Sequence, residues 1–214
     1  MKTAIRTIIA VPILLLTVTA SSPARGDAVS SAFTRSYKLE ARGKYSRALT
    51  ALSRVRQGQQ HSYIFQLRVG WLNYLARKHR LAVEAYQRAV RLAPMAIEPL
   101  QGMLLPQMAA RRWKDALTTA NKILGMAPAD DLAATRKAWI LFNLGRYRQA
   151  EQVYVQVLRQ YPANLTLRAG LGWARARQGR LKEAEKAFRA VLRYSSKNAS
   201  ARRGLAWVQK KAKR

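Results

Sequence analysis

The sequence repeats itself at a fixed interval of thirty-four residues, and this period constrains the fold more than any other feature. Three prolines mark the interval at Pro94, Pro128 and Pro162. Alanines keep it without a break at Ala48, Ala82, Ala116, Ala150 and Ala184. Four residues after each alanine stand Leu52, Tyr86, Ala120, Tyr154 and Phe188. A period of this length predicts stacked units that share one elongated hydrophobic core.

Each unit carries the signals of two helices joined by a turn. The units span residues 29–62, 63–96, 97–130, 131–164 and 165–198, and a shorter remnant follows from residue 199. Leu167, Leu171 and Ala174 have the spacing of one buried helix face. Glycines stand where three of the first helices must end, at Gly43, Gly145 and Gly179. Residues suited to capping precede three first helices, at Asp130, Asn164 and Asn198. The prolines predict the end of the second helix.

These features resemble a known family. The strings AVEAYQRAVRLAP, AEQVYVQVLRQYP and AEKAFRAVL, on a thirty-four-residue helix–turn–helix period, are similar to the tetratricopeptide repeat. The resemblance implies an all-α, right-handed superhelical solenoid of five repeats and a non-catalytic scaffold. It also implies that the first helices line a concave, peptide-binding surface. The family's carboxylate-gripping groove needs Lys and Asn at the fifth and ninth positions of the unit. Those places are mostly aromatic or apolar here, so we do not expect that specificity.

The remnant, residues 199–214, starts a repeat and stops after one helix. A repeat unit cannot bury its own apolar face, so the last complete unit leaves one side open to water. Leu205 and Val208 have the spacing to face inward from a single helix, and QKKAKR follows them. We therefore expect a capping helix with a basic tail.

A row of large side chains occupies the ninth position of the units. Its members are Tyr37, Trp71, Leu105, Trp139, Trp173 and, in the cap, Trp207. Helical geometry places this position about 130° from the centre of the buried face of the first helix. Adjacent aromatic side chains are Tyr74 and Phe142. One hypothesis is an aromatic groove for a peptide with bulky side chains, formed by Tyr37, Trp71, Tyr74, Trp139, Phe142, Trp173 and Trp207. The alternative is that these aromatics wedge between first helices as part of the core.

A second set of residues is basic. Forty Lys and Arg against ten Asp and Glu give the chain a net charge of +30. The turns between paired helices hold nine of these cations, which we call the basic edge: Lys44, Lys78, Arg80, Arg112, Lys114, Arg146, Arg148, Arg180 and Lys182. Stacking would align them along one side of the solenoid. The edge is interpreted either as a docking surface for anionic polymer or membrane, or as an ordinary solvated turn.

The first residues predict export. Lys2 and Arg6 precede a short apolar run from Ile8 to Val18, which is too short for a membrane span. We interpret residues 1–26 as a signal peptide cleaved after Ala20 or Gly26, with an uncleaved membrane anchor as the alternative. The mature protein is then expected in the periplasm or outside the cell. The chain has no cysteine, which excludes disulfides and thiolate metal sites.

Catalytic constellations are absent from the sequence. His61 and His79 do not make a metal site, and no nucleophile or dinucleotide motif is present. We therefore expect no enzyme activity, no cofactor, no metal and no specific nucleic-acid or small-molecule ligand. Three hypotheses remain: a scaffold that binds a protein or peptide in the cell envelope, a module for anionic polymer or membrane surfaces, and a self-associating subunit of a larger complex.

Overall fold

The computed structural model describes residues 25–213, so most of the predicted signal peptide lies outside the described residues. The helices are α1 (Arg25–Glu40), α2 (Tyr45–Ser53), α3 (Arg56–Gln59), α4 (Tyr63–Leu75), α5 (His79–Leu92), α6 (Glu98–Ala109), α7 (Trp113–Met126), α8 (Asp131–Asn143), α9 (Tyr147–Gln160), α10 (Leu165–Arg177), α11 (Leu181–Tyr194) and α12 (Ala199–Ala212). Residues 25–213 contain no strand. Cleavage after Gly26 would fall inside the first turn of α1, whereas cleavage after Ala20 would leave α1 intact.

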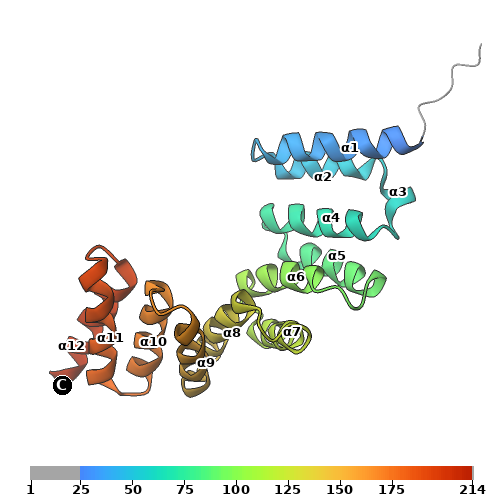
Figure 1. Cartoon of the computed structure of the whole chain (residues 1–214). Helices are drawn as coiled ribbons and strands as arrows, with labels where there is room; N and C mark the ends of the chain where they lie inside the picture. Colours follow the sequence, from blue (N-terminus) through green and yellow to red (C-terminus); the bar gives the residue numbers. More distant parts are fainter. Residues whose placement is uncertain (1–24, 214) are drawn as a thin grey trace, which may run out of the picture.

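The helices form five hairpins that stack into an arc (Figure 1). Each hairpin packs its second helix against the first helix of the next, as α5 does against α6 and α9 against α10. The predicted all-α solenoid is therefore confirmed. The expected cap is α12, which packs on α10 and α11 and buries Val208, with Leu205 against the same cluster. The first hairpin is the irregular one, because its second half is broken into α2 and the short α3.

The turn inside each hairpin contains a left-handed residue at the same place. Gly43, Gly145 and Gly179 have φ of 68°, 75° and 80°, as their positions predicted. Arg77 and Arg111 adopt φ of 60° and 56° in the second and third hairpins. A non-glycine residue there costs about 1–2 kcal/mol. Sequence analysis did not predict a left-handed residue at these two positions, because neither is a glycine.

Helix ends follow the expected chemistry, with one addition. Asp130, Asn164 and Asn198 each accept a hydrogen bond from the backbone N–H three residues on, at 2.8 to 3.1 Å. Ser62 does the same for α4 at 3.3 Å, a cap that sequence analysis missed. Helices α5, α7 and α9 end two residues before a proline, and α11 ends in the same register without one. The proline therefore reinforces a stop that the packing of the next hairpin already imposes.

One large side chain from each of two second helices is clamped between glycines of two first helices. Phe188 of α11 is fully buried, and a Cβ placed on either Gly172 of α10 or Gly204 of α12 would collide with its ring. Tyr86 of α5 is held in the same way between Gly70 and Gly102. In each pair, the first glycine is at the eighth position of its unit and the second is at the sixth position of the next unit. No larger residue fits at these positions, because an aromatic ring occupies the space.

The junctions without this aromatic ring hold larger residues at the same two positions. Leu52 replaces the ring in the first unit, and the two facing positions hold Ser36 and Arg68, which are hydrogen-bonded to each other at 3.0 Å. Ala120 replaces it in the third unit, where the facing positions hold Leu104 and Arg136. Side-chain volume is thus exchanged between positions, which keeps the interior filled. As a result, arginines enter the first helices at two of the five junctions.

We predict that Gly204→Ala lowers the free energy of unfolding by about 1–3 kcal/mol, because the added methyl group overlaps the buried ring of Phe188. The matched control is Gly125→Ala in α7, where a Cβ meets nothing within 4 Å. That variant should gain up to about 1 kcal/mol, since alanine is the better helix former. Urea unfolding followed by circular dichroism measures both, and an equal response of the two variants would contradict the clamp.

Candidate functional site: the concave groove

The first helices line a groove with two hollows, which lie along the row of ninth-position residues. The upstream pocket, about 490 Å³, is formed by α1, α4, α6 and α8, and its lining includes Tyr37, Trp71 and Leu105. The downstream pocket, about 640 Å³, is formed mainly by α8, α10 and α12 and includes Trp139, Phe142 and Trp173. Arg136 of α8 lines both pockets. The two hollows therefore meet at this arginine.

Exposure differs sharply along the aromatic row. Tyr37 and Trp139 are 53% and 47% exposed, so both present ring surface to solvent. Trp71 is half-buried and donates from Nε1 to Glu40 Oε1 at 2.6 Å, which ties α4 to α1. Trp173 is also half-buried and donates from Nε1 to Ser200 Oγ at 3.1 Å, which ties α10 to α12. Two members of the row therefore wedge between helices, and two face outward.

The remaining predicted groove residues have more specialised places. Phe142 stacks on Trp139 with ring centroids 5.8 Å apart and lines the downstream pocket. Tyr74 lines neither pocket and packs between Trp71 and His79. Trp207 lies against Trp173 at 6.2 Å and does not line the downstream pocket. The binding role of the row stays a prediction, and its exposed members that line a pocket are Tyr37 and Trp139.

The upstream pocket contains a cation that the protein neutralises itself. Arg68 is buried, forms an ion pair with Glu40 and donates from Nε to Ser36 Oγ at 3.0 Å. Its guanidinium carbon lies 3.8 Å from the centroid of the Tyr37 ring. Glu98 adds a second carboxylate to the pocket lining. The charge in this half of the groove is therefore largely balanced.

Several polar residues that line the two pockets were not among the predicted groove residues. They include Arg136, Arg177, Arg203 and Tyr154 in the downstream pocket and Tyr86 in the upstream pocket. Tyr154 comes from α9, an outer helix, and reaches the groove beside Gly170, where a Cβ would lie 2.9 Å from its hydroxyl oxygen. The pairing of Tyr154 with a glycine sixteen residues later was the available signal. Burial raises the pKa of Tyr154 and of Tyr86, and it lowers the pKa of Arg136.

The basic edge occupies the starts of the second helices. Lys44, Lys78, Arg112, Arg146 and Arg180 are the residues that precede α2, α5, α7, α9 and α11, and all are exposed. Arg80, Arg112 and Arg180 form ion pairs with carboxylates of the same hairpin or its neighbour. The other six edge cations form no ion pair within the described part of the chain.

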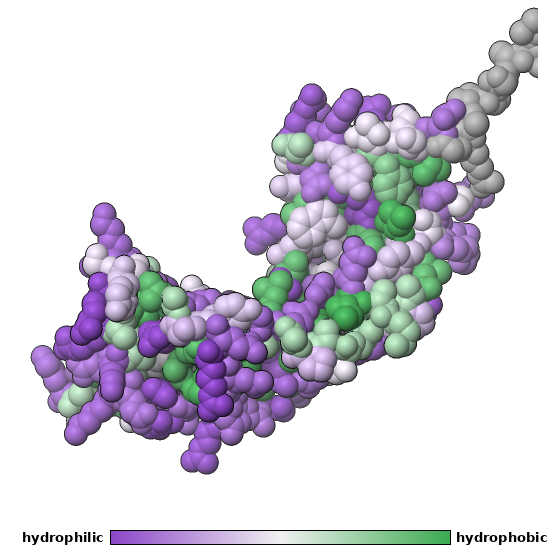
Figure 2. All heavy atoms as spheres, viewed as in Figure 1, coloured by the Kyte–Doolittle hydropathy of each residue, from purple (hydrophilic) through white to green (hydrophobic). Residues whose placement is uncertain are grey.

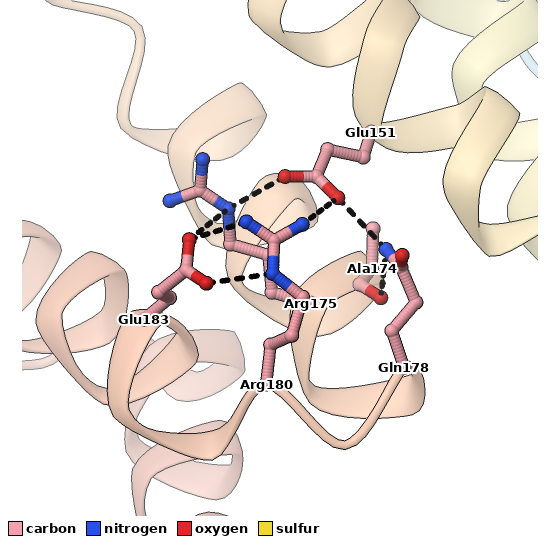
Figure 3. Close-up of polar contacts among 6 residues, drawn as sticks. All are labelled: Glu151, Ala174, Arg175, Gln178, Arg180 and Glu183. Carbon is pink, nitrogen blue, oxygen red and sulfur yellow. Dashed lines mark hydrogen bonds and ion pairs between the residues drawn. The ribbon is translucent and has the colours of Figure 1, made fainter.

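A polar network fixes the hairpins that carry the downstream pocket (Figure 3). Glu151 of α9 accepts hydrogen bonds from Arg175 Nε at 2.9 Å, Gln178 Nε2 at 2.8 Å and an Arg180 terminal nitrogen at 2.6 Å. Its side chain is only 12% exposed. Burial alone would raise the pKa of Glu151, but the hydrogen bonds and the two arginine charges outweigh it and lower the pKa from its usual 4.5. The network thereby joins α9, α10 and the start of α11.

Metal and membrane sites can be assessed for residues 25–213. No group of three or more His, Asp or Glu side chains gathers there in a way that could hold a metal ion. None of the described helices is long and apolar enough to cross a membrane. The groove therefore offers aromatic surface, guanidinium groups and hydroxyl groups as its binding chemistry.

We predict that Glu151→Gln lowers the free energy of unfolding at pH 7 by about 1–2 kcal/mol, because it removes a carboxylate that accepts charged hydrogen bonds. A lowered pKa means that Glu151 stabilises the fold above its unfolded pKa and that this contribution is lost as the pH falls below about 4.5. The difference between the two proteins should therefore shrink on acidification. Urea unfolding at neutral and acidic pH measures it.

Glu185→Gln is the matched control for this prediction. Glu185 pairs only with Arg189 of its own helix, a solvent-facing interaction worth less than about 0.5 kcal/mol. If Glu185→Gln and Glu151→Gln destabilise the protein equally at neutral pH, the network does not join the hairpins.

Comparison with known proteins identifies the fold. The family model described as tetratricopeptide repeat matches residues 34–96, 107–164, 135–199 and 170–214. No protein of curated function matches the sequence. Among solved structures, a tetratricopeptide repeat protein from Parabacteroides merdae is 18% identical with a TM-score of 0.78 and covers 86% of this chain and 73% of its own.

Two further structures are similar over most of their own length. MamA from Desulfovibrio magneticus is 18% identical, has a TM-score of 0.74, and covers 82% of this chain and 100% of its own. YrrB, described as a protein of this repeat class with an unusual peptide-binding site, is 14% identical with a TM-score of 0.70. That match covers 83% of this chain and 95% of YrrB. With repeat matches over more than half of the chain and the observed stack of helical hairpins, the protein belongs to the tetratricopeptide repeat family.

Proposed function

We propose that this protein is an exported, non-catalytic scaffold that captures a segment of a partner protein in its concave groove. Protein–protein interaction is the activity that the repeat fold favours. The observation that carries the proposal is the exposed Trp139, stacked on Phe142 in the wall of the downstream pocket. An aromatic side chain at the centre of a concave surface is the usual anchor of a protein interface.

The location in the cell envelope rests on the sequence alone. The positive start at Lys2 and Arg6 and the short apolar run after them are typical of an export signal. Sequencing the amino terminus of the mature protein from its native cell tests this part of the proposal. A mature chain that begins at Ser21 supports export, and a retained Met1 in the cytoplasmic fraction overturns it.

We predict that a photo-crosslinking residue at position 139 gives a discrete protein adduct in the native cell, because a groove ligand must pass over the exposed Trp139. Mass spectrometry identifies the adduct. With the partner in hand, Trp139→Ala should weaken its affinity at least tenfold, as expected for a central aromatic anchor. Trp139 is preferable to Trp173 for this purpose, since Trp173 also packs on Phe188 and would disturb the fold.

Tyr194 is the matched control. It is 77% exposed and lies on the outer helix α11, away from the groove. A crosslinker at position 194 should not give the same adduct, and Tyr194→Ala should leave the affinity unchanged. The same adduct from both positions, or no loss of affinity in Trp139→Ala, would overturn the groove as the capture surface.

A second function is favoured by one observation, namely the six cations of the basic edge that form no ion pair within residues 25–213. Such a row attracts anionic surfaces in a salt-dependent way. We predict that replacing Lys44, Lys78 and Arg146 by Gln weakens binding to phosphatidylglycerol-containing vesicles at least tenfold at low salt. None of the three side chains caps its helix, so the fold is expected to persist.

The control for the basic edge removes three positive charges from positions outside the edge. Arg91, Lys122 and Lys210 are exposed and do not belong to the edge, and their replacement by Gln should have a smaller effect. Vesicle co-sedimentation at low and high salt measures both triple variants. Equal losses in the two would show that net charge alone, and not the edge, is responsible.

A further inference from the structure

The downstream pocket is the part of the groove whose lining holds three arginines and no carboxylate. Its wall includes Arg136 from α8, Arg177 from α10 and Arg203 from α12. Its lining contains no Asp or Glu, and none of the three arginines forms an ion pair with a carboxylate among residues 25–213. The upstream pocket differs, because Glu40 pairs with Arg68 there and Glu98 lies in the wall.

Burial of Arg136 disfavours its charged form. The residue sits in the middle of the groove and is half-buried, and burial lowers its pKa without depriving it of its charge at neutral pH. The charge of Asp130 opposes this effect of burial, but Asp130 lies outside the pocket lining and forms no ion pair with Arg136. Arg136 occupies the sixth position of its unit. The same position is a glycine in every unit that follows an aromatic ring on the preceding helix, whereas Arg136 follows Ala120. A half-buried guanidinium that is not ion-paired favours the binding of an anion beside it.

A hydroxyl group completes the polar lining. Tyr154 lines the downstream pocket, and its hydroxyl makes no hydrogen bond to the described residues. Burial raises its pKa, so the group is a neutral donor throughout the physiological range. Thr135, Thr166 and Ser200 add further hydroxyls to the same wall. These groups point to an acceptor-rich ligand, since carboxylates accept several hydrogen bonds at once.

The apolar part of the pocket accommodates a bulky side chain next to these donors. Trp139 and Phe142 stack with their ring planes only 9° apart, and Trp173 forms part of the same wall. The three arginines line the same pocket as these rings. The pocket therefore combines aromatic surface with cations.

We propose that the downstream pocket binds a partner segment in which a bulky apolar residue is flanked by Asp or Glu, with the apolar side chain on Trp139 and Phe142 and the carboxylates on Arg136, Arg177 and Arg203. This inference rests on the proposed capture of a protein segment in the groove. It deepens that function by naming the chemistry of the segment. The occupant is an acidic peptide because its carboxylates supply the counter-charges that the pocket lacks, whereas a basic segment would be repelled. The signal-peptide region of this chain, which carries Lys2 and Arg6, is excluded as the occupant for the same reason.

The experiment begins with selection from a random displayed peptide library on the mature protein at physiological salt. We expect the enriched peptides to carry an aromatic or large aliphatic residue next to one or more carboxylates. Fluorescence anisotropy then compares the best peptide with its isosteric form, in which Asn and Gln replace Asp and Glu. The isosteric peptide should bind at least tenfold more weakly. This comparison changes the ligand alone, so it does not depend on whether a variant protein folds.

Matched protein variants separate the pocket from the general positive charge of the molecule. Arg177→Gln with Arg203→Gln should weaken binding of the acidic peptide at least tenfold. Lys186→Gln with Arg193→Gln removes the same charge from the outer face of α11 and should change it less than twofold. Tyr154→Phe, which deletes only the hydroxyl, should weaken binding about threefold or more. Its control, Tyr86→Phe, removes the equivalent hydroxyl from the upstream pocket and should have no effect.

The outcomes are distinguishable. If selection yields groove-dependent peptides that are neutral or basic, or if the isosteric peptide binds equally well, the acidic ligand is overturned and the scaffold function stands. If the pocket double variant and the α11 double variant lose equal affinity for the acidic peptide, the attraction is non-specific and the inference is also overturned. If Trp139→Ala does not weaken the binding of the selected peptides, the groove is not the binding surface, and the proposed function is overturned as well.

Discussion

Neighbouring hairpins are held together by the burial of one side chain from each second helix between two first helices. Where that side chain is Tyr86 or Phe188, both facing positions are glycine, because an aromatic ring leaves no room for a Cβ. Where it is smaller, the facing residues are larger, as Ser36 and Arg68 are around Leu52. Close packing of protein interiors requires this exchange of volume, since a void forfeits contacts and an overlap forces strain.

The same packing rule shapes the groove. The ring of Tyr154 passes beside Gly170 to the inner surface, so an outer helix supplies a hydroxyl to the pocket floor. The absence of a ring at Ala120 coincides with Arg136 on the next first helix, which places a cation where the two pockets meet. The chemistry of the inner face is in this sense a consequence of how the outer helices pack.

Hydropathy varies over the arc. Figure 2 shows hydrophilic side chains over much of the visible surface of the C-terminal hairpins, whereas apolar side chains gather over α4 and α6. Two of the few carboxylates of this basic protein have partners in other helices. Glu40 neutralises Arg68 and accepts from Trp71, and Glu151 joins α9, α10 and the start of α11. Because acids are scarce, the arginines that they do not reach remain available to a ligand.

The hairpins, their order and the capping helix follow from the sequence alone. Those features depend on local chemistry that recurs every thirty-four residues, such as the left-handed turn at Gly145, the cap at Asn164 and the burial of Val208. The exposure of each aromatic in the row and the ion pairing of each arginine depend instead on tertiary contacts. Trp173 is anchored by Ser200, and Arg68 is neutralised by Glu40, through contacts between residues of different hairpins. The periodic pattern places all members of a row alike, so it could not distinguish the wedged Trp173 from the exposed Trp139. That distinction arises from neighbours on other helices, such as Ser200 of α12 beside Trp173.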